Sequence, residues 1–134
     1  MKDDFINSGD TDIKVSNNNH KFVWDVAKNE SNIRKHHVSF DVAIFVFNDD
    51  NRIEVFDQEH SYDEDRYDVI GVPTEKRTSD DDHQVTCVLG KVNNLLFVVY
   101  TPRIMDDEER IRIISARKAN KMEEMLYASQ WREV

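Results

Sequence analysis

The chain of 134 residues is poor in cysteine, glycine and proline, with one, three and two of them. The single cysteine, Cys87, excludes an internal disulfide framework and is typical of the reducing cytoplasm, where we expect the protein to act. The longest nearly apolar runs, residues 40–47 and 95–100, are far shorter than the roughly 20 residues that span a bilayer. The first ten residues carry no apolar signal-peptide core. The sequence therefore predicts neither a transmembrane helix nor a secretion signal.

The charge of the chain is acidic overall but unevenly distributed. The chain has 27 acidic and 18 basic residues and a net charge of −9, which argues against a nucleic acid as the obvious partner. The stretch 110–121, by contrast, contains no acidic residue. Its basic residues are Arg110, Arg112, Arg117, Lys118 and Lys121. They favour a local basic patch on an acidic protein.

The pattern of apolar residues predicts one α+β domain over residues 20–134 after a flexible N-terminal tail over residues 1–19. Because the tail has no apolar period, we expect its deletion to leave the melting temperature nearly unchanged. Asp25 is a good N-cap for a first helix. Ser39 can cap a second, nearly wholly buried helix over residues 40–47, for which a strand is the competing interpretation. Asn120 begins the C-terminal helix with a capping-box-like pattern.

Five segments between the second and the last helix have the length and composition of strands. They cover residues 52–56, 66–72, 84–89, 95–101 and 110–115. Polar turns join them and no helix-length segment intervenes, which is typical of an antiparallel β-meander. The predicted fold is an antiparallel β-meander with two N-terminal helices and one C-terminal helix packed against one face of the sheet.

One face of the first helix carries polar groups that suit an anionic ligand. Lys28, Asn32, Lys35 and His36 lie at helical spacing on that face, and Trp24 precedes Lys28 by four residues. Cations, an amide, an imidazole and a nearby indole could hold a stackable anion such as RNA. The alternative is a solvated helix face with a tryptophan that anchors the core.

Arginines near the ends of the predicted strands form a second candidate site. Arg66 opens one strand, Arg112 lies on the last strand, and Arg117 follows that strand directly. Guanidinium groups that converge on one end of a sheet would bind phosphate, because their fork matches phosphate oxygens. The alternative is ion pairing with neighbouring acidic residues. No metal-ligand spacing, phosphate-binding loop or nucleophile triad is found in the sequence, and no metal or cofactor is predicted.

Three motifs, in order along the chain, resemble BrnT-type toxins of type II toxin–antitoxin systems. The first is Phe22-x-Trp24-Asp25-x-x-Lys28 followed by Asn32-x-x-Lys35-His36-x-Val38-x-Phe40. The second is Ser61-x-Asp63-Glu64-Asp65-Arg66-Tyr67-x-x-Ile70-Gly71. The third is Leu96-Phe97-Val98-Val99-Tyr100-Thr101, then Arg112-Ile113-Ile114-Ser115-Ala116-Arg117-x-Ala119-Asn120-x-x-Glu123-x-x-x-Tyr127. Together they cover most of residues 22–127.

The resemblance implies a RelE-like ribonuclease fold and a cognate BrnA-like antitoxin. Such an antitoxin folds onto the toxin and binds promoter DNA through its own ribbon-helix-helix domain, and the complex contains a toxin homodimer. Relative to the family, residues 72–94 are an insertion, and His37 replaces a common glycine. If that position needs a positive φ, histidine is among the more tolerable substitutes for glycine.

The leading hypothesis is metal-independent RNA cleavage, in which the ribose 2′-hydroxyl attacks the adjacent phosphate. We assign Arg66, Arg112 and Arg117 to the phosphate, and His36 to acid–base catalysis because imidazole titrates near neutral pH. The residues predicted to hold the RNA strand are Trp24, Lys28, Asn32, Lys35, Lys118 and Lys121.

The alternative hypothesis is a catalytically weak protein-binding module of the same fold that serves as antitoxin partner or co-repressor. The two hypotheses differ in what they predict for the arginines. A solvent-open cleft with no carboxylate between Arg66, Arg112 and Arg117 favours the nuclease, whereas arginines that are buried and each tied to an acid favour the module.

Overall fold

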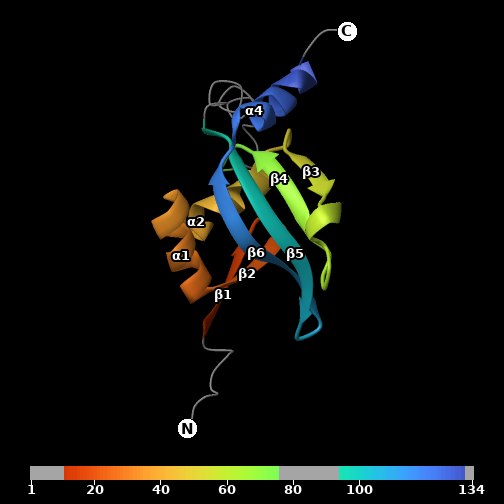
Figure 1. Cartoon of the computed structure of the whole chain (residues 1–134). Helices are drawn as coiled ribbons and strands as arrows, with labels where there is room; N and C mark the ends of the chain where they lie inside the picture. The colour runs from red at the N-terminus through yellow and green to blue at the C-terminus, as the bar shows by residue number, and fades with distance from the viewer. Residues whose placement is uncertain (1–10, 76–93, 132–134) are drawn as a thin grey trace.

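The computed structural model describes residues 11–75 and 94–131 and confirms the predicted α+β class (Figure 1). Six strands form one sheet, and three α-helices accompany it in the described part of the chain. In order, the elements are β1 (Asp12–Asn17), β2 (His20–Asp25), α1 (Val26–His36), α2 (Phe40–Ala43), η2 (Ile44–Asn48), β3 (Ile53–Phe56), η3 (Gln58–His60), β4 (Tyr67–Gly71), β5 (Leu96–Met105), β6 (Glu108–Lys118), α4 (Lys121–Ala128) and η5 (Ser129–Trp131). The predicted strand over residues 84–89 and most of the predicted insertion lie outside the described residues.

The sheet is mixed, with the strand order β1-β2-β6-β5-β4-β3. From β3 to β6, each strand runs antiparallel to the next one along the chain. However, β2 joins the sheet parallel to β6, with Phe22 opposite Ile111 and Val23 opposite Arg112. The prediction of a wholly antiparallel meander is therefore wrong. Neither the length nor the composition of residues 20–25 shows with which distant strand β2 pairs.

The prediction of an unstructured tail over residues 1–19 is wrong for residues 12–17, which form β1. This strand pairs antiparallel with β2 over its full length, from Asp12 opposite Asp25 to Asn17 opposite His20. Val15 packs against the core from this strand. Deletion of residues 1–19 would thus remove a paired strand, so we no longer expect it to leave the melting temperature unchanged.

The ends of α1 follow the predicted capping chemistry. Asp25 is the N-cap, and its carboxylate accepts a hydrogen bond of 3.0 Å from the backbone N–H of Lys28. The helix ends at His37, which has a left-handed backbone with φ 62° and whose N–H donates to the carbonyl of Ile33 at 2.8 Å. This position does require the positive φ that glycine tolerates best.

Residues 40–47 form the predicted helix and not the alternative strand. The segment is α-helical only over α2 and continues as the 3₁₀ helix η2. Ser39 caps it, and its side chain accepts a hydrogen bond from the N–H of Val42. The residues that it buries include Phe40, Val46 and Phe47. These buried side chains pack the segment against the sheet, in the same layer as α1, while Val42 stays exposed.

The main core lies between the sheet and the layer of α1, α2 and η2, which is visible beside the sheet in Figure 1. We call this side of the sheet the core face and the opposite side the outer face. The helix α4 packs through Tyr127 against a second apolar cluster that includes Ile70 and Leu95. As predicted, α4 starts with a capping box, in which the Asn120 side chain accepts from the N–H of Glu123 while the Glu123 side chain accepts from the N–H of Asn120.

Candidate functional site on the outer face

Alternation along β5 decides which side chains reach the outer face. Leu96, Val98 and Tyr100 pack with the main core. Successive side chains of a strand point to opposite faces, so Phe97 and Thr101 lie on the outer face. The residues of β6 that stand opposite them therefore share that face.

A register shift in β6 brings two of the predicted arginines to this same face. Arg112 stands opposite Thr101 and Arg117 stands opposite Phe97, although five residues separate the two arginines. In a regular strand, residues an odd number of positions apart point to opposite faces. The shift opposite Val99 and Tyr100 adds one residue to β6 and so restores both arginines to the outer face.

The third arginine joins this face from the strand on the other side of β5. Arg66 directly precedes Tyr67, which stacks on Tyr100 of the core side with ring centroids 5.4 Å apart. Alternation therefore places Arg66 on the outer face. There it stands near Thr101, whose hydroxyl donates to the carbonyl of Asp65 at 2.6 Å. Arg66, Thr101 and Arg112 thus form one row across three neighbouring strands.

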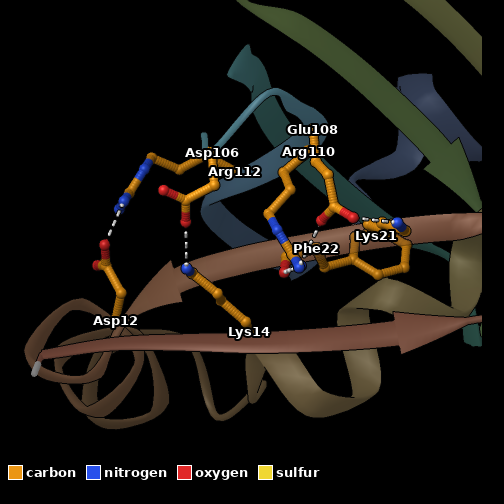
Figure 2. Close-up of polar contacts among 8 residues, drawn as sticks. All are labelled: Asp12, Lys14, Lys21, Phe22, Asp106, Glu108, Arg110 and Arg112. Atoms are coloured by element: carbon orange, nitrogen blue, oxygen red, sulfur yellow. Dashed lines mark hydrogen bonds and ion pairs between the residues drawn. The ribbon is translucent and has the colours of Figure 1, made fainter. Parts of the chain in front are cut away.

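Both outer members of this row carry an ion pair that leaves part of the guanidinium unused. Arg66 lies 3.4 Å from a carboxylate oxygen of Glu64, and Arg112 lies 3.0 Å from one of Asp12, which Figure 2 shows. The Nε atoms of both arginines are shielded from solvent and have no hydrogen-bond partner in the described part of the chain. A buried donor without a partner is costly, so each guanidinium can donate a further hydrogen bond to an oxygen ligand that reaches it.

Arg117 is held in place by a two-pronged ion pair and a ring contact. Its two terminal nitrogens donate to the two carboxylate oxygens of Glu123, each at 2.9 Å, and its guanidinium lies 4.2 Å from the centre of the Phe97 ring. Burial alone would raise the pKa of Glu123, but the hydrogen bonds from Arg117 and from the Asn120 backbone hold it below its ordinary value. The assignment of Arg117 to phosphate is therefore corrected: its fork fastens α4 to the sheet.

A group of proton-binding side chains that the sequence analysis missed lies beside the arginine row. Asp57 follows β3 and its N–H donates to the carbonyl of Arg66 at 2.8 Å. Its carboxylate lies 3.0 Å from Nδ1 of His60. The carboxyl of Asp68, on β4, lies close enough to that of Asp57 for the two to influence each other's pKa, while its Oδ1 is shielded from solvent and has no hydrogen-bond partner among the described residues.

The environment separates the titration of these two carboxyl groups. Burial raises the pKa of Asp68 to about 6, and the charge of Asp57 and the hydrogen bond to it act in the same direction. Burial also tends to raise the pKa of Asp57, but its hydrogen bonds to His60 and Asp68 and the charge of His60 keep it below its ordinary value. Asp68 can thus hold a proton up to about pH 6 while Asp57 stays ionised, which is the arrangement that acid–base catalysis uses.

Two of the residues predicted to bind RNA are part of the core instead. Trp24 is 1% exposed and packs edge-to-face on Phe40, so its indole is not available to stack on a base. Asn32 is 6% exposed and its side chain makes three hydrogen bonds, to the carbonyls of Val38 and Ala116 and from the N–H of Ala116. Both residues fasten α1 to the sheet, and the prediction that they bind RNA is wrong.

The other predicted residues of α1 are exposed but lie on the wrong side of the sheet. Lys28, Lys35 and His36 stand on the surface of α1, which covers the core face. The sheet therefore separates His36 from Arg66 and Arg112, and the assignment of His36 as their acid–base partner is wrong. Helical spacing brought these residues onto one face correctly, but it carries no information on where that face lies relative to the arginines.

Lys118 and Lys121 are both exposed, at the end of β6 and the start of α4. Over residues 11–75 and 94–131, no three histidine, cysteine, aspartate or glutamate side chains are grouped in a way that could hold a metal ion. None of the helices in these ranges is long and apolar enough to cross a membrane.

Comparison with known proteins supports the resemblance found in the sequence. Residues 24–79 match a family model described as the ribonuclease toxin, BrnT, of type II toxin–antitoxin systems. The match confirms the resemblance to BrnT-type toxins over a segment somewhat shorter than half of the chain. No curated protein matches the chain. The matched segment contains Arg66 and both carboxyl groups of the Asp57–Asp68 pair.

Proposed function

We propose that this BrnT-type protein is a ribonuclease toxin that cleaves single-stranded RNA on the outer face of its sheet. The family match indicates a ribonuclease toxin of a toxin–antitoxin system. The observation that supports this face as the site is the row of Arg66 and Arg112, each with a shielded Nε that lacks a partner among the described residues, beside the Asp57–Asp68 pair. Cations for a phosphate and a group that titrates near pH 6 thus lie on one surface.

The reaction that these groups suit is attack of the ribose 2′-hydroxyl on the adjacent phosphate. The 2′-oxygen forms a bond to phosphorus, the bond to the 5′-oxygen breaks, and the products are a 2′,3′-cyclic phosphate and a free 5′-hydroxyl. Arg66 and Arg112 would stabilise the negative charge that grows on the phosphoryl oxygens. The group of Asp57, His60 and Asp68 would take the proton of the 2′-hydroxyl and return a proton to the leaving oxygen.

The remaining predicted contacts and partners fit this site with one change. Lys121 is retained as a contact for the RNA backbone, whereas Lys28 and Lys35 lie across the sheet. Lys118 also faces that other side, because it stands opposite Leu96 of the main core and lines a pocket with Ile33 and Val38. A type II toxin has a protein antitoxin as partner, which we take to be a BrnA-like ribbon-helix-helix protein. The RelE-like fold, the homodimer, the cytoplasmic location and the metal independence of the reaction belong to the same proposal.

A second candidate function is favoured by the ion pairs of the outer face. Each of the three arginines has a carboxylate partner: Glu64 for Arg66, Asp12 for Arg112 and Glu123 for Arg117. Together with the net charge of −9, this pairing is what a catalytically weak binding module would show. Such a module would bind its antitoxin and act as co-repressor without cleaving RNA.

The test is cleavage of single-stranded RNA by the purified full chain, by Arg66→Ala and Arg112→Ala, and by Arg34→Ala as the control. Arg34 is an exposed arginine of α1, on the other side of the sheet. Loss of one transition-state donor typically lowers the rate about 10²- to 10³-fold. We expect this loss for Arg66→Ala and Arg112→Ala, no change for Arg34→Ala, and no effect of EDTA.

Three outcomes separate the hypotheses. A wild-type protein that cleaves neither free RNA nor RNA on ribosomes would leave only the binding module. Cleavage that survives both substitutions would keep a ribonuclease but place its site elsewhere. Cleavage that EDTA abolishes would keep the site and refute the metal-independent reaction.

A further inference from the structure

The strand β1 lies at the edge of the sheet and outside the segment that matches the toxin family. The match begins at residue 24, whereas β1 spans Asp12–Asn17. It forms one edge of the sheet and pairs with β2 alone in the described sheet. The C-terminal half of β1 is well fixed, since Val15 packs against the core and Asn17 accepts a hydrogen bond of 2.9 Å from the side chain of Asn48.

The other end of β1 places a carboxylate on one of the two arginines of the proposed site. Asp12 lies 3.0 Å from Arg112, which reaches it across β2 from the neighbouring strand β6 (Figure 2). The side chains of Asp12 and Arg112 are only 15% and 17% exposed. Solvent and salt screen such a shielded pair less than an ion pair at the surface.

The chemistry of this contact resembles that of a phosphate ligand. A carboxylate oxygen and a phosphate oxygen are both anionic acceptors for a guanidinium. Asp12 uses one terminal nitrogen of Arg112, while Nε of the same guanidinium stays shielded and without a partner in the described residues. The Asp12 carboxylate therefore leaves one hydrogen-bond donor of Arg112 without an acceptor. A ligand that offers more oxygen atoms to this guanidinium could replace the carboxylate.

The second contact at this end of β1 is weak. Lys14 pairs with Asp106 of the β5–β6 turn at 3.4 Å, and the side chains are 43% and 86% exposed. Exposed pairs of this kind contribute little to stability. Because backbone pairing with β2 holds β1 in place over its full length, the Asp12 side chain can turn away from Arg112 while the strand stays in the sheet.

We propose that β1 is an autoinhibitory strap, in which Asp12 occupies the place of an RNA phosphate on Arg112 and leaves it when RNA binds. This inference rests on the proposed function, because it takes Arg112 to be a phosphate ligand. It adds that the resting protein has a lowered affinity for RNA, which is restored when the Asp12 carboxylate is removed.

The experiment compares RNA binding by Asp12→Asn with two matched variants of the full chain. Asp12→Glu keeps the carboxylate. Asp106→Asn removes one acidic charge nearby, and asparagine tolerates the positive φ of 54° at that position. Fluorescence anisotropy with a single-stranded RNA of about 12 nucleotides measures the affinity over a series of salt concentrations, and circular dichroism checks the fold.

We expect Asp12→Asn to bind RNA about three- to tenfold more tightly, as expected for loss of a competing ion pair. The logarithm of its affinity should also fall more steeply with the logarithm of the salt concentration, because one more phosphate is bound. Asp12→Glu should bind like the wild type, and Asp106→Asn should show at most a small gain. The double variant Asp12→Asn with Arg112→Ala should lose the gain, since the freed guanidinium is absent.

Failure of the strap and failure of the proposed function have different signatures. If Arg112→Ala abolishes cleavage but Asp12→Asn and Asp106→Asn bind RNA equally, the site stands and the strap is refuted. If Asp12→Asn gains affinity through Arg112 and no variant cleaves RNA, the strap stands and the ribonuclease does not. If neither Asp12→Asn nor the wild type binds RNA, the strap is refuted as well.

Discussion

Replacement of Asp68 by asparagine should make the protein more stable at neutral pH and less active. In the folded chain the pKa of Asp68 is raised from its ordinary 3.8 to about 6, chiefly by burial and then by the carboxylate of Asp57. Above pH 6 the folded protein therefore holds two neighbouring negative charges. The amide of asparagine can donate a hydrogen bond to Asp57 as the protonated acid does, and it carries no charge.

The expected gain in stability follows from proton linkage. Between pH 3.8 and about 6 the folded chain binds a proton at Asp68 that the unfolded chain has lost, so the free energy of unfolding falls as the pH rises through this window. At about 1.4 kcal/mol for each pH unit, full conversion would give about 3 kcal/mol above pH 6. Because Asp68 is partly exposed to solvent, screening reduces this figure, and we expect Asp68→Asn to gain about 1 kcal/mol at pH 7.5.

Urea denaturation followed by circular dichroism at two pH values measures this gain. By the same linkage the gain should shrink to about a third at pH 4.5, where wild-type Asp68 is largely protonated. Asp63, an exposed acid in the connection that precedes β4, provides the control: Asp63→Asn should show no comparable dependence on pH. A loss of stability at pH 7.5, or a gain that is equal at both pH values, would refute the raised pKa of Asp68 in the folded protein. Activity of Asp68→Asn should fall about 10²-fold or more, as expected for loss of an acid–base group.

Three further substitutions test individual contacts. His37→Gly should raise the free energy of unfolding by about 1 kcal/mol in urea titrations, because glycine adopts the left-handed conformation at φ 62° without strain; a neutral effect would contradict this. Tyr127→Phe should cost about 2 kcal/mol by the same method, since its buried hydroxyl donates to the Asp49 carboxylate at 2.6 Å; a cost below about 0.5 kcal/mol would show that this bond is dispensable. Arg117→Ala should speed amide hydrogen exchange in α4 and reduce RNA cleavage less than Arg112→Ala does; an equal loss of cleavage would restore Arg117 to the phosphate site.

Local chemistry made the helices predictable from the sequence. Asp25, Ser39 and Asn120 were each identified as N-caps from their position before a helical pattern, and each accepts the expected hydrogen bond. The positive φ of His37 followed from the resemblance to a family that commonly has glycine there. Such features depend on contacts within a few residues, so one sequence is enough to identify them.

Contacts between distant segments could not be predicted in the same way. The parallel pairing of β2 with β6 and the pairing of β1 with β2 depend on which strands meet. Neither the composition of a strand nor the spacing of its apolar residues specifies its partner. The register shift in β6 decides that Arg112 and Arg117 share a face, whereas a strict period of two along this strand would place them on opposite faces. For the same reason the pairing of Asp57 with Asp68, across the β3–β4 connection, was missed.

The acidic charge of the chain does not by itself prevent RNA from reaching Arg66 and Arg112. At physiological salt the Debye length is about 8 Å, so most of the exposed acidic residues are screened from these arginines. The groups that decide binding are therefore the carboxylates in contact with them, Glu64 and Asp12. A tethered carboxylate competes at an effective concentration of the order of millimolar, which one phosphate in dilute solution does not match. A strand of RNA presents several phosphates on one chain and can displace both carboxylates together. Under the proposed function, the ion pairs of the outer face would thus select extended RNA over free phosphate and mononucleotides.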